Sequence, residues 1–186
     1  MNSGILKLSQ LKSLENSTVN KIFCMDVDYR DGFAIAAGIL FDDWSSKQTL
    51  LETCVKVDKI EEYESGKFYK RELPCLLKLI QSLDTLPDIF LVDSFVYLDD
   101  RMKPGLGAYL YNEFNGKIPV IGVAKTNFKE CSNKIELLRG ESKSPLFISS
   151  AGIDLEKAAE FVSQMHGEFR NPTLLKKVDR LCREYC

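Results

Sequence analysis

Two carboxylates set into an apolar run constrain this 186-residue chain more than any other feature. The run Lys21–Tyr29 reads KIFCMDVDY, and its β-prone, mostly apolar residues predict a strand that carries Asp26 and Asp28. Ionised carboxylates in a sheet cost free energy unless an opposite charge accompanies them. A divalent cation is the simplest such charge, so we take Asp26 as the anchor of a metal site. The alternative is that Asp26 or Asp28 points into solvent from an edge strand.

The length and composition predict one domain, spanning residues 1–186, with a sizeable core, since 45% of the residues are hydrophobic. A run of about 18 apolar residues, as needed for a membrane span, is missing from the sequence. Residues 1–20 are polar and lack the pattern of a secretory signal. We expect them to form a polar, partly helical N-terminal extension. The protein is therefore expected to be intracellular (cytoplasmic) and monomeric.

Cysteine and histidine usage limits the chemistry. The six cysteines show no CxxC spacing, and His166 is the one histidine in the sequence. A zinc site is not expected, and reduced thiols are. His166 lies in an amphipathic stretch near the C-terminus, where we expect a surface or packing role. The net charge of −2 argues against coating nucleic acid through bulk electrostatics, but bound Mg²⁺ ions would allow nucleic acid as a substrate.

The order of predicted elements is that of a ribonuclease H-like α/β fold: a three-strand antiparallel meander plus parallel strands in a mixed sheet flanked by helices. In such a sheet the first strand is central and lies beside the strand after the first helix. Pro74 is tolerated in a first turn, so that helix is predicted to begin near Arg71. After the Lys21–Tyr29 strand, periodicity predicts strands over Phe33–Phe41 and Thr49–Val57, a helix over Arg71–Leu83, a strand over Pro87–Val92, a helix over Gly105–Phe114, a strand over Lys117–Ala124, a polar excursion over Thr126–Ser144, a strand over Pro145–Ser149, and helices over Asp154–Met165 and Pro172–Glu184.

Three acidic residues from separate regions should converge at one end of this sheet: Asp26, Glu72 in the first turn of the first helix, and Asp93 after a buried strand. An all-oxygen ligand set favours Mg²⁺ or Mn²⁺ over zinc. Such an ion can activate water and stabilise a leaving oxygen, so a histidine-poor chain could cut a phosphodiester. Lys125 ends the next strand and is placed to meet the phosphate or the attacking water. Its alternative role is an ordinary lysine in solvent.

Further polar residues are weaker candidates for the same site. Asp28 shares the face of Asp26 and could orient the site or add a ligand. Asp154 follows Ser149-Ser-Ala-Gly152 and is either the N-cap of a helix or a fourth ligand. Arg71 could clamp a phosphate or be an exposed residue at the helix start.

Four segments of the sequence resemble the endonuclease V family of Mg²⁺-dependent deoxyinosine/inosine endonucleases. They are Met25-Asp26-Val27, Gly66-x4-Arg71-Glu72, Pro87-Asp-Ile-Phe-Leu-Val-Asp93 and, most specifically, Ile118-Pro-Val-Ile-Gly-Val-Ala-Lys125. The resemblance runs from about Phe23 to Arg183. It implies that Asp26, Glu72 and Asp93 match the family's metal ligands and that Lys125 matches its active-site lysine.

The sequence departs from the family in the segments that read the base. Where the family has a Pro-Tyr-Ile-Pro wedge, this chain has Glu62-Tyr63-Glu64-Ser65, which keeps the tyrosine and loses both prolines. The glycine-rich turn after the second aspartate is replaced by larger residues such as Ser94 and Val96, which prevent the close backbone approach that glycine permits. The family's histidine near the last strand is also absent, with Gly152-Ile153-Asp154 in its place. The metal-binding half of the family pattern is retained and the base-reading half is altered.

We therefore expect a metal-dependent endonuclease that acts on DNA or RNA containing inosine. Aromatic residues could stack on a displaced base or simply pack in loops. One alternative is a non-catalytic nucleic-acid-binding or interaction module that retains the scaffold. Another is a phosphodiesterase for a structured RNA or branched DNA. The residues proposed to bind substrate are Tyr63, Gly66, Arg71, Phe95, Tyr97 and Arg101.

Overall fold

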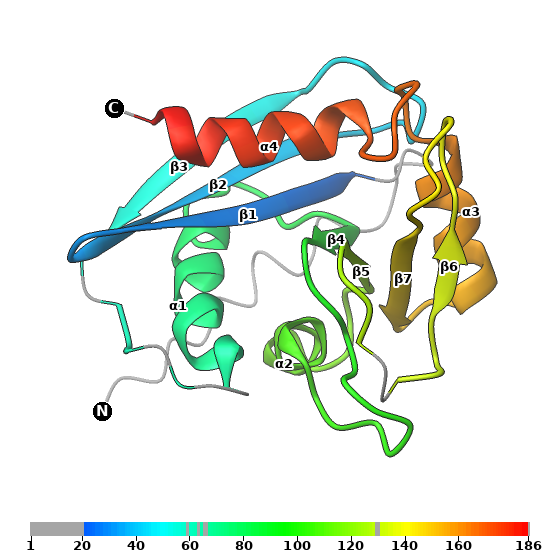
Figure 1. Ribbon diagram of the computed structural model, residues 1–186. Helices are drawn as coiled ribbons and strands as arrows, with labels where there is room; N and C mark the ends of the chain where they lie inside the picture. The colour runs from blue at the N-terminus through cyan, green and yellow to red at the C-terminus, as the bar shows by residue number, and fades with distance from the viewer. Residues whose placement is uncertain (1–20, 59, 63, 65–66, 129–130, 186) are drawn as a thin grey trace.

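The chain folds around one seven-stranded sheet (Figure 1). This computed structural model describes residues 21–58, 60–62, 64, 67–128 and 131–185, so the predicted extension over residues 1–20 lies outside the described residues. The elements are β1 (Ile22–Arg30), β2 (Phe33–Phe41), β3 (Leu51–Val57), α1 (Phe68–Ile80), β4 (Ile89–Val92), α2 (Leu106–Glu113), β5 (Val120–Ala124), β6 (Ile135–Leu137), β7 (Leu146–Ala151), α3 (Leu155–Gln164) and α4 (Thr173–Glu184).

The strand order, β3-β2-β1-β4-β5-β7-β6, confirms the predicted ribonuclease H-like mixed sheet. Strands β1 to β3 form an antiparallel meander. Strand β1 pairs in parallel with β4, and β4 with β5. The register of the β1–β4 pair ends at Met25 opposite Val92. The next residues along these two strands are Asp26 and Asp93, so the topology brings the two aspartates to the same edge.

Helices cover both faces of the sheet (Figure 1). One face buries Ile22 and Cys24 of β1 in a core with residues of α3 and α4. The opposite face buries Phe23 and Met25 in a core with residues of α1 and α2. Successive strand residues point to opposite faces. Asp26 therefore lies on the α4 side of β1, in line with Cys24.

Helix α1 begins earlier than the sequence indicated. It starts at Phe68, so Pro74 lies inside the helix and not in its first turn as predicted. The ring of Tyr69 stacks on Tyr109 of α2, with ring centroids 3.7 Å apart, and this contact holds the added first turn. Pro74 has no backbone N–H and so removes one hydrogen bond from the helix. The packing of this helix tolerates that loss. The earlier start moves Glu72 from the first turn to the fifth residue of the helix.

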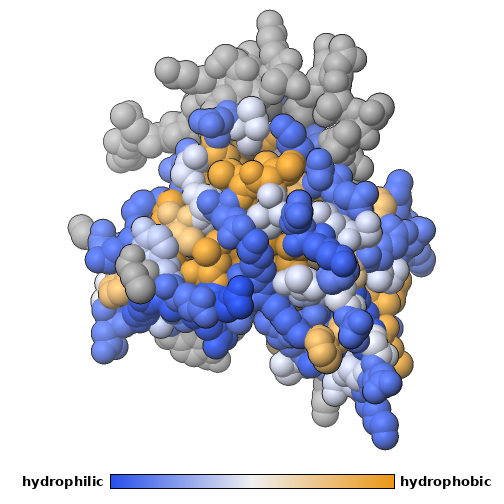
Figure 2. Space-filling view, turned by 90° about the horizontal axis from the view of Figure 1, so that it is seen from above, coloured by the Kyte–Doolittle hydropathy of each residue, from blue (hydrophilic) through white to orange (hydrophobic). Residues whose placement is uncertain are grey.

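The polar stretch after β5 contains a strand that the sequence did not predict. Residues Ile135–Leu137 form β6, which pairs antiparallel with β7 at the edge of the sheet. Strand β7 itself runs antiparallel to β5. The surface seen from above, on the side of α4, is mostly hydrophilic with hydrophobic areas near its centre (Figure 2). Among the described helices, none has the length and apolarity to cross a membrane.

Candidate active site

A gap in the sheet makes room for the site. Strand β1 continues to Arg30, whereas its neighbour β4 ends at Val92. Asp26 and the residues after it therefore have a paired strand, β2, on one side and no pairing to β4 on the other. The Oδ1 atom of Asp26 accepts a hydrogen bond of 2.8 Å from the backbone N–H of Val27. This bond fixes the carboxylate at the mouth of the gap.

The carboxyl ends of two parallel strands supply the next two residues. Asp93 follows β4, and Lys125 follows β5. The Lys125 ammonium donates a hydrogen bond to Asp93 Oδ2 and forms an ion pair with it. The carbonyl of Lys125 accepts a hydrogen bond from Arg170, which also donates to Pro145 O at 2.6 Å. Arg170 thereby ties the end of β5 to the start of β7 and fixes the backbone that carries Lys125.

Glu72 reaches the site from α1. Its side chain is buried, with only 5% of the residue exposed. Within the described part of the chain, nothing donates a hydrogen bond to Glu72 Oε2, although this atom is fully buried. A buried carboxylate oxygen without a partner costs free energy. Glu72 is thus a candidate to interact with a cation that compensates its charge.

These residues surround one open cavity of about 480 Å³. Acidic residues, one lysine, one arginine and three aromatic rings contribute to its wall. Phe95 and Phe128 are 6.2 Å apart between ring centroids, and 40% of Phe128 is exposed. The wall is formed by Asp26, Val27, Asp28, Phe68, Glu72, Asp93, Ser94, Phe95, Ala124, Lys125, Thr126, Asn127, Phe128, Asp179, Cys182 and Arg183.

The carboxylates repel one another in this partly buried setting. Burial, followed by the charge of Asp93, raises the pKa of Asp26 from 3.8 to about 7. Burial and the charges of Asp26 and Asp93 raise the pKa of Glu72 well above its usual value. Burial acts to lower the pKa of Lys125, but the hydrogen bond and charge of Asp93 outweigh it and the pKa is raised. Lys125 therefore stays protonated near neutral pH. A further cation close to the carboxylates would stabilise their ionised form.

The donor set fits a hard divalent cation. Asp26, Glu72 and Asp93 offer carboxylate oxygens, including the unpartnered Glu72 Oε2, and carboxylates are the ligands that Mg²⁺ and Mn²⁺ prefer. Over the described residues, no group of three or more His, Cys, Asp or Glu side chains is arranged as a ready metal-binding cluster. Lys125 forms an ion pair with one oxygen of Asp93.

Sequence reasoning missed Asp179. This residue lies on α4 and lines the same cavity as Asp26, and its charge contributes to raising the pKa values of Asp26 and Lys125. In the sequence it lies in a helical stretch of mixed charge, where Asp179 and Arg183 at i, i+4 resemble an ordinary surface pair. The signal in the sequence was that Asp179 directly follows Val178, an apolar residue that α4 buries against the sheet.

Two of the weaker candidate ligands have other partners. Asp28 lines the cavity, but its carboxylate is paired with Arg30 at 3.1 Å. Asp154 is the N-cap of α3 and accepts a hydrogen bond of 3.0 Å from the backbone N–H of Lys157. Asp154 does not line the cavity described here.

The proposed substrate-binding residues are dispersed. Phe95 lines the cavity. Arg71 lies away from the cavity wall, with its guanidinium 3.7 Å from the centre of the Tyr29 ring. Tyr97 forms an isolated bridge with Pro104 and packs against the core of the α1 face. The side chain of Arg101 is exposed outside the cavity wall. Tyr63 and Gly66 lie outside the described residues.

Gly122 explains why the Ile118–Lys125 segment positions the loop after β4. A Cβ atom at this position would lie 2.3 Å from Ser94 O and 2.7 Å from Ser149 Oγ. The missing side chain lets the loop pass directly over β5, where Val96 N–H donates a hydrogen bond of 3.0 Å to Ser149 Oγ. Further along the loop, Leu98 N–H donates to Lys103 O at 2.8 Å, and Asp100 Oδ1 accepts a hydrogen bond of 2.6 Å from Ser132 N–H.

The fold and the acidic cavity define a ribonuclease H-like α/β protein with a carboxylate site at the carboxyl edge of its parallel strands. The chain belongs to the endonuclease V family: the family's sequence model, described as Endonuclease V, matches residues 5–144. The chain is also 27% identical over 121 residues to endonuclease V of Desulfurococcus amylolyticus, and this match covers 65% of the chain and 53% of the relative. It therefore spans about half the length of that relative.

Solved structures of the family share the fold. Endonuclease V of Ciona intestinalis, solved in complex with a 23mer DNA containing an inosine followed by a ribo-adenosine, has a TM-score of 0.73 and 18% identity over 90% of this chain and 85% of that chain. The catalytic domain of human endonuclease V has a TM-score of 0.73 and 22% identity over 90% and 82% of the two chains. Endonuclease V of Bacillus subtilis has a TM-score of 0.73 and 22% identity over 95% and 86%.

Proposed function

We propose that this protein is a divalent-metal-dependent endonuclease that hydrolyses phosphodiester bonds in nucleic acid, as a single ribonuclease H-like domain acting as a monomer. The observation that carries the proposal is the cavity shared by Asp26, Glu72, Asp93 and Lys125. Burial, followed by repulsion among the carboxylates, raises the pKa values of Asp26 and Glu72, and perturbed carboxylates in a cleft are typical of functional sites. Membership of the endonuclease V family supports the same chemistry.

The residues divide into a cation-binding group and a phosphate-facing group. Asp26, Glu72 and Asp93 would hold Mg²⁺ or Mn²⁺. When bound, the ion supplies positive charge that lowers the pKa of water and stabilises a leaving oxygen. Lys125 remains a cation in this site, so it can balance the charge of a phosphate that enters next to Asp93. Asp179 adds negative charge on the α4 side of the cavity.

We propose a single-stranded, inosine-containing DNA or RNA as the substrate. Phe95 and Phe128 border the acidic centre, and 40% of Phe128 is exposed, so an aromatic surface is available for an unpaired base. The Ciona intestinalis relative was solved with DNA containing inosine. The larger residues after Asp93 change the shape of the base pocket in this chain, so discrimination between inosine and other bases is expected to differ from that of the family.

A non-catalytic nucleic-acid-binding role is the second candidate. The observation that favours it is the ion pair between Lys125 and Asp93, which occupies an oxygen that a metal would need. The buried Glu72 with an unpartnered oxygen weighs against it. A binding module would have no use for this buried charge, and a hydrophobic replacement would be more stable.

A cleavage panel tests the proposal. Single-stranded RNA and DNA with one inosine are compared with the same sequences carrying adenosine, each with Mg²⁺, Mn²⁺ or EDTA. We expect strand scission that requires the metal, favours inosine and is lost in the Asp93→Asn variant. The matched control is Asp154→Asn, which makes the same chemical change at a helix N-cap where asparagine serves equally well. Metal binding without any cleavage of these substrates would support the binding module instead.

A further inference from the structure

The C-terminal helix α4 forms one wall of the acidic cavity and packs on the sheet through its apolar face. Its fully buried side chains form a single stripe of Leu174, Val178 and Cys182, beside which the partly buried Leu175 and Leu181 pack. Asp179 and Cys182 line the cavity. The position of Asp179 relative to Asp26 therefore depends on how firmly α4 lies on β1.

Both ends of α4 need hydrogen bond partners, because the terminal backbone groups of a helix have none within the helix. At the start, Pro172 provides no side-chain cap. At the end, Arg30 of β1 donates hydrogen bonds to three backbone carbonyls: Cys182 O at 3.2 Å, Arg183 O at 2.7 Å and Tyr185 O at 3.1 Å. A cation at this end also interacts favourably with the helix dipole.

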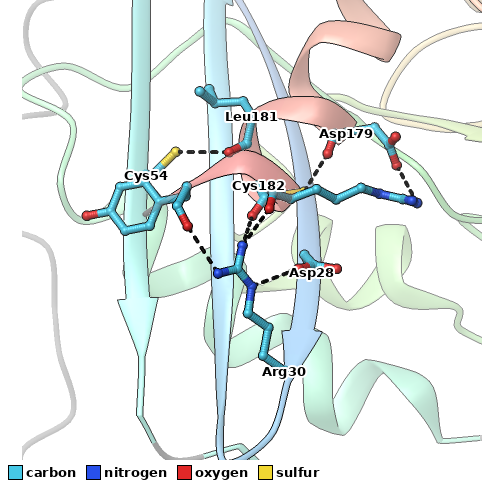
Figure 3. A network of polar contacts seen from close by, with 8 residues as sticks. Asp28, Arg30, Cys54, Asp179, Leu181 and Cys182 are labelled. Atoms are coloured by element: carbon cyan, nitrogen blue, oxygen red, sulfur yellow. Dashed lines mark hydrogen bonds and ion pairs between the residues drawn. The ribbon is translucent and has the colours of Figure 1, made fainter.

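The same guanidinium is itself held in place by Asp28. Its Nε atom donates a hydrogen bond of 3.1 Å to Asp28 Oδ2. Figure 3 shows Arg30 reaching from β1 to the last turn of α4, with Asp28 beside it. Asp26, Asp28 and Arg30 are every second residue of β1 and therefore lie on the same face of the strand. One strand thus carries both the acid of the cavity and the residue that fixes its opposite wall.

We propose that Arg30 is a positioning residue for the nuclease reaction: it locks the end of α4 onto β1 and so holds Asp179 against the acidic centre. The catalytic consequence of this inference rests on the proposed function. The docking of α4 by Arg30 does not depend on that function. Lysine cannot replace Arg30 fully, because one ammonium lacks the planar fork that here serves Asp28 and three carbonyls at once.

Cysteine labelling can report the docking of α4 without any reference to cleavage. Cys182 is buried under α4, whereas Cys75 is equally buried under α1 on the opposite face of the sheet, each 1% exposed. Of these two thiols, detachment of α4 exposes Cys182 and leaves Cys75 buried, whereas global unfolding exposes both. The ratio of their maleimide labelling rates, measured by peptide mass spectrometry on the native full chain, separates the two events.

The variants are Arg30→Met and Arg30→Lys. The matched control is Arg180→Met, because Arg180 is an exposed arginine of the same helix and forms an ion pair of 3.7 Å with Glu184. For Arg30→Met we expect the Cys182/Cys75 labelling ratio to rise at least about tenfold and kcat to fall by roughly 10- to 100-fold at little changed KM, the size expected for a misplaced site. Arg30→Lys should restore part of both, and Arg180→Met should match the wild type.

An unchanged labelling ratio in Arg30→Met overturns the inference, whatever the cleavage result. A raised ratio with an unchanged kcat overturns the positioning role. If the wild-type protein cleaves none of the substrates, the proposed function fails, and the labelling ratio alone then decides whether Arg30 docks α4.

Discussion

Neutralising Asp26 should stabilise the metal-free protein at alkaline pH. The pKa of Asp26 is raised from 3.8 to about 7 by burial and by the charge of Asp93. At about 1.4 kcal/mol per pH unit, this corresponds to roughly 4 kcal/mol for ionising Asp26 in the folded state. Asp26→Asn removes that cost and keeps the hydrogen bond that Oδ1 accepts from Val27 N–H. The new amide protons need partners, which offsets about half of the gain.

The effect has a definite pH dependence. A carboxyl whose pKa is raised on folding contributes its stabilisation fully below about pH 4, and the contribution is lost as the pH rises through 7. The wild type should therefore lose stability between pH 5 and 8.5 in EDTA, and Asp26→Asn should lose less. We expect the variant to be about 2 kcal/mol more stable at pH 8.5, or roughly 4–8 °C in Tm for a chain of this size. At pH 5 the difference should largely disappear.

Thermal melts of both proteins in EDTA at pH 5 and 8.5 measure this directly, with Asp154→Asn as a control that makes the same chemical change outside the cavity. Repeating the melts with Mn²⁺ adds a second readout. A ligand at 100 times its Kd stabilises a folded protein by about 2.7 kcal/mol, and Asp26→Asn should lose this gain. A variant that melts below the wild type at pH 8.5 in EDTA would refute the inferred cost of ionising Asp26 in the folded protein.

Three further predictions concern the surroundings of the site. Gly122→Ala should cost roughly 1–3 kcal/mol in urea unfolding, because the new Cβ would meet Ser94 O at 2.3 Å. Asp154→Ala should cost about 1 kcal/mol through loss of the α3 cap, with an unchanged cleavage rate. Lys125→Met should reduce kcat by about 100-fold or more in the cleavage assay, whereas a rate within twofold of the wild type would remove Lys125 from the proposed mechanism.

Sequence periodicity was sufficient for the layout of the sheet because long apolar strands leave a strong pattern. The run Phe33–Phe41 matches β2 at both ends, and the central place of β1 followed from the order of elements. The pattern failed where tertiary contacts decide. Strand β6 has only three residues, none of them fully buried, and it exists through its pairing with β7. The start of α1 depends on the stacking of Tyr69 on Tyr109, which no local signal shows.

The same distinction holds for the site. Asp26, Asp93 and Lys125 could be singled out because each occurs in or directly after an apolar strand run, and the order of strands determines which run ends meet. Asp179 was missed, because a helix places it by packing and not by the end of a strand, and its position next to the buried Val178 is a weaker signal. The role of the Asp28–Arg30 pair could not be predicted from the sequence either, because it depends on the hydrogen bond between Arg30 and α4 in the folded protein.

The loop after β4 is tied to two neighbouring segments of the chain. Val96 N–H donates a hydrogen bond to Ser149 Oγ of β7, and Asp100 Oδ1 accepts hydrogen bonds from the backbone N–H and the hydroxyl of Ser132. A graft over residues 94–104 must therefore keep both anchors, the bond to Ser149 and the bonds from Ser132, if the loop is to hold its position beside Asp93. Under the proposed function, such a graft is the direct way to test whether this loop sets the base preference.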